Sequence, residues 1–60
     1  IMEKKITLTF YNNNPIDIRI DDIDEVVVQN EVTFILSRGR YAYPVKESKS
    51  RVLKMIEIAK

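Results

Sequence analysis

Apolar side chains occupy every second position in two stretches near the start of the chain. The first stretch covers residues 6–10 and the second covers residues 16–20, with polar or charged residues between the apolar ones. A period of two is typical of half-buried β-strands. Between them, Asn12-Asn13-Asn14-Pro15 predicts a turn, because Asn tolerates left-handed backbone and Pro presets φ. We therefore expect an antiparallel hairpin.

The pattern changes after the hairpin, where residues 21–25 are mostly acidic. This stretch predicts a short bend or helical turn with Ile23 as its one buried anchor. The β-branched run 26–28 predicts a third strand, Gln29-Asn30 a turn, and 32–36 a fourth strand with Phe34 and its even-numbered neighbours on one face. A turn around Gly39 then leads to a fifth strand at 41–45. Pro44 lacks an N–H donor, so this strand or its end should lie at a sheet edge, or the strand should stop there.

The final segment has helical spacing. Val52, Met55, Ile56 and Ala59 recur every three or four residues, Leu53 widens their stripe, and Ser48 is the expected N-cap. A helix of about 12 residues is too short to be stable alone, so it should pack on the sheet. The sequence predicts one α+β domain over residues 1–60. Its fold is a small curled antiparallel sheet of four to five strands followed by one C-terminal amphipathic helix, in the order β-β-β-β-β-α.

Composition limits how such a domain is stabilised. Of the 60 residues, 45% are apolar and 32% charged, with a net charge of +1, which favours a folded chain over a disordered one. Domains this small are marginally stable, and the absence of Cys excludes disulfides. No apolar run reaches the length of a membrane span and no secretory signal is visible, so we expect a cytoplasmic protein.

The residue inventory argues against catalysis. Cys and His are absent, and a single Gly cannot build a phosphate-binding loop. We therefore predict a protein that is not an enzyme and has no cofactor, metal or small-molecule substrate. The alternative is a cation site among Asp17, Asp21, Asp22, Asp24 and Glu25. That cluster lacks the Gly and the distant Glu of a calcium loop, so a solvated bend is favoured.

Both faces of the central strands are partly apolar, which suggests contact with another chain. Val27, Ile35 and Pro44 each lie opposite neighbours that we assign to the core, and one helix can cover only one face. Either the sheet curls over itself, or these three residues meet a protein partner or a second copy, with Arg38 and Arg40 at the rim. On this interpretation, Ile35→Asp should disrupt association while the fold survives.

Charge segregation supports an alternative function. Residues 17–25 carry five acids and one base, whereas residues 38–51 carry five bases and one acid. The basic segment predicts a compact nucleic-acid-binding or regulatory domain of the mobile-element type, in which bases meet phosphate and an aromatic ring stacks on a nucleobase. Its contact residues would be Arg38, Arg40, Lys46, Lys49, Arg51 and Tyr41. The low net charge favours the protein-interaction hypothesis.

The C-terminal half also resembles a known family. A strand at 32–36, a turn with Gly39, then Tyr43, Val45, Lys46-Glu47-Ser48 and a helix with Val52 and Ile56 resemble the small bacterial flagellar FlbD/SwrD-type proteins. Leu8-Thr9 and Ile23-Asp24-Glu25 are similar to earlier elements of that family. The turn at Arg38-Gly39 departs from the family's Asn-Gly. The resemblance implies a non-enzymatic cytoplasmic accessory that supports flagellar motor power by contacting motor proteins at the membrane.

Overall fold

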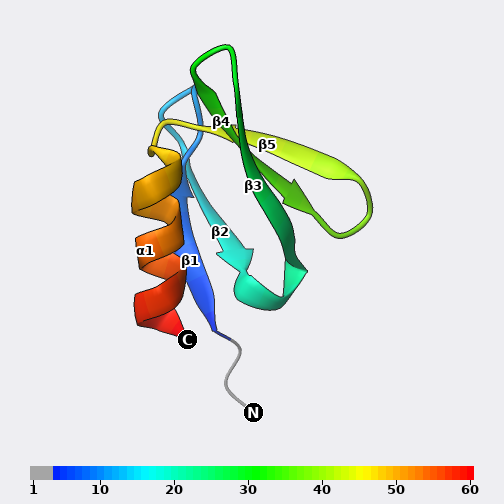
Figure 1. The fold of residues 1–60 in the computed structure, drawn as a ribbon, viewed down its shortest axis with the longest axis vertical. Coiled ribbons are helices and arrows are strands. Elements are labelled where there is room, and N and C mark those ends of the chain that lie inside the picture. The colour runs from blue at the N-terminus through cyan, green and yellow to red at the C-terminus, as the bar shows by residue number, and fades with distance from the viewer. Residues whose placement is uncertain (1–3) are drawn as a thin grey trace.

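The computed structural model describes residues 4–60, which form the five strands and the C-terminal helix that the sequence predicts (Figure 1). The first two strands are β1 (Lys5–Thr9) and β2 (Pro15–Arg19), paired antiparallel with Ile6 opposite Ile18 and Leu8 opposite Ile16. Asn13 takes a φ of 71° in their turn, and the Asn12 side-chain oxygen accepts a hydrogen bond from the Asn14 N–H at 3.0 Å. The predicted hairpin is confirmed.

The acidic stretch after the hairpin is shorter than expected. A 3₁₀ turn, η1 (Ile20–Asp22), is followed directly by β3 (Ile23–Gln29), so Asp24 and Glu25 belong to the strand, next to a β-bulge. Ile23 is half-buried and packs against the core. The bend is therefore confirmed, and Ile23 is a partly buried anchor, although Ile20 of η1 packs against the core as well.

The remaining strands form an antiparallel meander with β3. They are β4 (Val32–Ser37) and β5 (Tyr41–Val45). The turn between β3 and β4 lies at Asn30 and Glu31, both with positive φ, one position later than predicted. Gly39 has a φ of 87° in the next turn. As predicted from Pro44, β5 is an edge strand of its sheet.

The five strands form two sheets, not the one curled sheet that the sequence predicts. One sheet is the pair β1–β2, and the other has the order β3-β4-β5. The turn η1 separates β2 from β3, so their backbones do not pair. The sheets meet where Phe10 bridges Val45 and the Lys46 N–H donates to the Thr9 carbonyl at 2.8 Å. Seven apolar side chains form the core cluster, namely Ile6, Leu8, Ile18, Val26, Ile35, Val45 and Val52.

Helix α1 (Lys49–Ala59) packs against β1 and β3 and lies beside β1 in the ribbon view (Figure 1). The Ser48 hydroxyl accepts a hydrogen bond from the Arg51 N–H at 3.2 Å, which confirms the predicted N-cap. Val52 is fully buried, and Met55, Ile56 and Ala59 pack against the core. Leu53 is 47% exposed, so its assignment to the buried stripe is wrong. No helix within residues 4–60 is long and apolar enough to cross a membrane.

Candidate interaction surface

One face of the three-stranded sheet is apolar although it does not belong to the core cluster. Directly paired residues of neighbouring antiparallel strands project from the same face. Val27 pairs with Phe34, which pairs with Pro44, and Leu36 pairs with Ala42. With Val32, these residues make what we call the outer sheet face: Val27, Val32, Phe34, Leu36, Ala42 and Pro44. All are half-buried except the exposed Ala42, and none is in the core cluster.

The structure corrects one residue of the predicted partner-binding set. Val27 and Pro44 lie on the outer sheet face as expected, but Ile35 has 0% exposure and pairs with Val26 and Tyr43 on the inner face. Ile35 therefore cannot contact a partner in this structure. Phe34, which we assigned to the core side, takes its place outside. The physical cause is that the hairpin and α1 cover the odd-numbered side of β4.

Sequence reasoning could have found Phe34. A two-residue turn between two strands pairs odd-numbered residues with even-numbered ones, whichever of the two turn positions is correct here. Val27 must then share a face with an even-numbered residue of β4, which excludes Ile35. Alternation along each strand separates its two faces, and the cross-strand pairing determines which faces belong together.

The two predicted rim arginines lie in the turn between β4 and β5, and both are exposed. The Arg38 N–H donates to the Asp22 carbonyl at 2.8 Å, and its guanidinium donates to the Asp21 carbonyl at 3.1 Å. These bonds tie Arg38 to η1. Arg40 has a φ of 68° and immediately precedes β5. Arg40 is therefore the arginine available at the rim of the outer sheet face.

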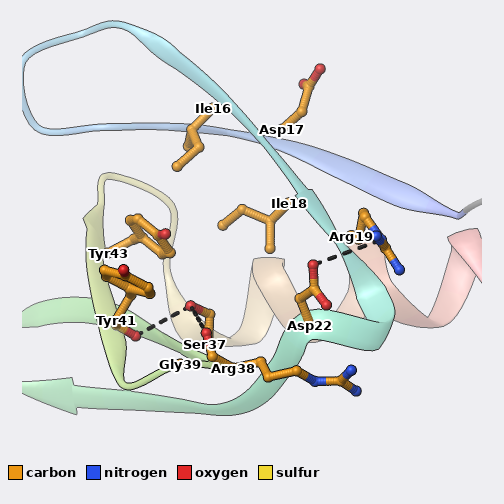
Figure 2. Close-up of a pocket in the computed structure, with 10 residues that line it drawn as sticks. All are labelled: Ile16, Asp17, Ile18, Arg19, Asp22, Ser37, Arg38, Gly39, Tyr41 and Tyr43. Carbon is orange, nitrogen blue, oxygen red and sulfur yellow. Dashed lines mark hydrogen bonds and ion pairs between the residues drawn. The ribbon is translucent and has the colours of Figure 1, made fainter.

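A groove that the sequence did not predict lies between β2 and β5 (Figure 2). Its volume is about 410 Å³, and the side chains of Ile16 and Ile18 point across it toward Tyr43. Tyr41 and Tyr43 stack with ring centroids 6.2 Å apart. The period-two pattern places all four side chains on inward faces, but only the packing of the two sheets brings them together.

The polar groups of the groove are committed to local contacts. The Asp22 carboxylate lies 3.7 Å from the Arg19 guanidinium. The Ser37 hydroxyl lies 3.4 Å and 3.5 Å from the carbonyl oxygens of Tyr41 and Arg38. A catalytic serine needs a base within hydrogen-bond reach, and the contacts of Ser37 are to backbone carbonyls. The groove therefore offers shape and apolar surface rather than an activated nucleophile.

The residues of the alternative nucleic-acid site fall into two groups at opposite ends of β5. Arg38, Arg40 and Tyr41 lie at its beginning, and Tyr41 is 62% exposed. Lys46, Lys49 and Arg51 follow its end and enter the first turn of α1. Five strand residues separate the groups by roughly 16 Å. The Lys46 ammonium also donates to the Asn13 side-chain oxygen. The sequence segment is basic, but the fold does not gather it into one patch.

The acidic residues likewise make separate contacts. Asp17 accepts a hydrogen bond from the Thr7 hydroxyl at 2.6 Å and lies 3.6 Å from the Lys5 ammonium. The Thr7 hydroxyl, followed by the Lys5 charge, lowers the pKa of Asp17 below its usual value. Within residues 4–60, no group of three or more acidic side chains is arranged to hold a metal ion.

Glu47 forms a polar link between β1 and the start of α1. Its carboxylate accepts bonds from the Thr9 N–H and the Thr9 hydroxyl, both at 2.9 Å. Burial raises the pKa of Glu47, but the two Thr9 bonds, a bond from the backbone N–H of Glu47 and the Arg51 charge together outweigh burial, so the net pKa lies below its usual value.

Comparison with known proteins adds no relative. No protein-family model, curated protein or solved structure matches this chain.

Proposed function

We propose that this chain is a non-catalytic protein-interaction module that binds its partner through the outer sheet face. The observation that carries the proposal is the row Val27–Phe34–Pro44, which crosses all three strands without packing in the core cluster. Contiguous apolar patches on small domains are characteristic of interaction sites, because leaving them in water forgoes about 25 cal/mol per Å². An aromatic ring at the centre of the patch is the usual anchor of such an interface.

The resemblance to the FlbD/SwrD-type proteins supports a narrower form of this proposal. Residues 32–56 carry the resemblance, and this range includes β4 and β5, which supply most of the outer sheet face. On that basis the module is an accessory of the flagellar motor, and the protein partner is a motor component.

The nucleic-acid alternative ranks lower because its basic residues lie at both ends of β5. Its remaining support is the exposed Tyr41 beside Arg38 and Arg40. Binding of this kind weakens steeply with salt, which separates it from apolar docking.

Affinity capture from the host lysate, with and without nuclease, tests the proposal. The two variants to compare are Phe34→Ser, on the outer sheet face, and Leu53→Ser, which removes a comparable apolar side chain from the exposed side of α1. We expect a protein partner that survives nuclease, is lost with Phe34→Ser and is retained with Leu53→Ser. Circular dichroism checks that both variants are folded. Capture that nuclease abolishes, or that Phe34→Ser leaves unchanged, would refute the proposal.

A further inference from the structure

The two edge strands of the three-stranded sheet carry opposite charge. Residues 23–31 contain three acids, Asp24, Glu25 and Glu31, and no base. Residues 38–46 contain three bases, Arg38, Arg40 and Lys46, and no acid, while β4 between them is uncharged. We call residues 23–31 the acidic flank of the outer sheet face and residues 38–46 its basic flank; Arg38 is bonded to η1 and Lys46 to Asn13, so within residues 4–60 Arg40 is the base of that flank without such a bond.

The flanks are not neutralised by each other within one chain. Two strand spacings separate β3 from β5, about 10 Å, which is close to the Debye length at 0.1 M salt. Glu25 and Arg40 are both exposed, and neither forms an ion pair with another residue in the range 4–60. Both charges are thus available to a molecule that covers the face between them.

A second copy of this chain fits the face in one orientation. A twofold axis that lies between the sheets of the two copies and runs parallel to β4 places β3 of one copy over β5 of the other. Each residue keeps its position along the strand direction under that rotation, so residues at the same level of the two sheets face each other. Glu25 shares its row with Leu36 and Ala42, so it meets the end of β5 where Arg40 lies in the second copy. Phe34 of each copy lies near the axis.

Other arrangements of two copies are disfavoured. A twofold axis across the strands would place β3 over β3 and so bring the acidic flanks together, and like charges opposed at an interface are unfavourable. Edge-to-edge pairing through β5 is also hindered. The Lys46 N–H points outward to Thr9, so by alternation the backbone groups of Ala42 and Pro44 also point outward, and Pro44 lacks its N–H.

We infer that the outer sheet face is a homodimer interface, formed by face-to-face packing of two copies about an axis parallel to β4, with Glu25 of each copy beside Arg40 of the other. This inference rests on the proposed function's assignment of the outer sheet face, and it replaces the motor component with a second copy of this chain as the molecule that covers the face. Aligned sheets pack about 10 Å apart with interdigitating side chains. The dimer would bury the outer sheet face of both copies. It would also form two equivalent contacts, each between the acidic flank of one copy and the basic flank of the other.

Sedimentation equilibrium at low salt tests the inference by comparing dimerisation of the wild type with that of variants whose charges at Glu25 and Arg40 are reversed. The wild type should be dimeric. Glu25→Arg alone places two basic residues opposite each other at positions 25 and 40, and Arg40→Glu alone places two acidic residues there. Each variant should weaken dimerisation by at least about tenfold, because the dimer contains two such pairs and each contributes roughly 0.7 kcal/mol. Mixing the two variants should restore a heterodimer, because each pair across the axis then joins opposite charges. The double variant should dimerise like the wild type.

The matched control applies the same charge changes on α1. Glu57→Arg and Lys54→Glu alter net charge equally but lie on exposed helix positions, and their mixture should behave as the separate proteins do. A wild type that is monomeric at high concentration would overturn the homodimer and leave a different protein partner possible through the same face. A dimer insensitive to the exchange, or an assembly that grows beyond two copies, would also overturn it.

Discussion

Replacing Ile35 by Ala tests whether the odd-numbered side of β4 is the buried side. Ile35 is fully buried in the core cluster, between Val26 and Tyr43 in the register. Removing the buried methyl groups of an isoleucine costs about 2–5 kcal/mol, because the surrounding core collapses only partly into the space. A domain of 60 residues has a total stability of roughly 3–9 kcal/mol at 0.05–0.15 kcal/mol per residue. This single change should therefore remove a large share of the stability.

The assay is urea denaturation followed by circular dichroism, with Phe34→Ala as the matched variant on the opposite face. With a slope of about 1 kcal/mol per M for so small a domain, a loss of about 3 kcal/mol lowers the midpoint by about 3 M. Phe34 is half-buried, so its truncation should lower the midpoint by less than that of Ile35, although more atoms are removed.

Ile35→Asp follows from the same reasoning and reverses our sequence-based expectation for that variant. An unpaired carboxylate in a fully buried position costs more than the domain can supply, so Ile35→Asp should unfold the chain. If Ile35→Ala lowered the midpoint less than Phe34→Ala, or if Ile35→Asp remained folded, our assignment of the two faces of β4 would be wrong.

Three further substitutions probe the links between elements. Glu47→Gln should cost about 1 kcal/mol at pH 7 through its weakened bonds to Thr9. Because folding lowers the pKa of Glu47, the ionised carboxylate stabilises the fold above its ordinary pKa of 4.5, and this stabilisation is lost as pH falls through the folded-state pKa. The difference in urea midpoint between wild type and Glu47→Gln should therefore shrink on acidification. A difference that stays constant with pH would contradict this. Ser48→Ala should cost about 1 kcal/mol by removing the helix N-cap, and an unchanged urea midpoint would argue against capping. Gly39→Ala should lower the free energy of unfolding by about 1–2 kcal/mol, because φ is +87° and the new Cβ would lie 3.1 Å from Tyr41 Cε2. The midpoint of thermal unfolding should fall by several degrees, and an unchanged midpoint would refute the strain.

Some residues of the candidate interface are predicted by the sequence pattern, and others are determined only by tertiary packing. Val27 and Pro44 were identified from alternation alone, because side chains of a strand must point to opposite faces. Ile35 was misassigned because alternation separates two faces without saying which one is covered. Thr33 and Ser37 share the face of Ile35 on β4, and both are buried, with the Ser37 hydroxyl directed toward backbone carbonyls.

Local chemistry was sufficient for the elements themselves. The hairpin around Asn13, the turn at Gly39 and the cap at Ser48 depend on neighbours within a few residues, and all three are present. Backbone sterics and short-range hydrogen bonds determine such features, and both follow from the residue types of the local sequence.

The division of five strands into two sheets, the groove between β2 and β5, and the buried side of β4 were decided only by tertiary structure. Each depends on contacts between segments far apart in the chain, such as the Phe10–Val45 bridge and the packing of Val52 into the core. The physical reason is that burial is a property of assembled layers. Alternation along β4 separates Val32, Phe34 and Leu36 from Thr33, Ile35 and Ser37, but only the packing of the hairpin and α1 determines that the second set is buried.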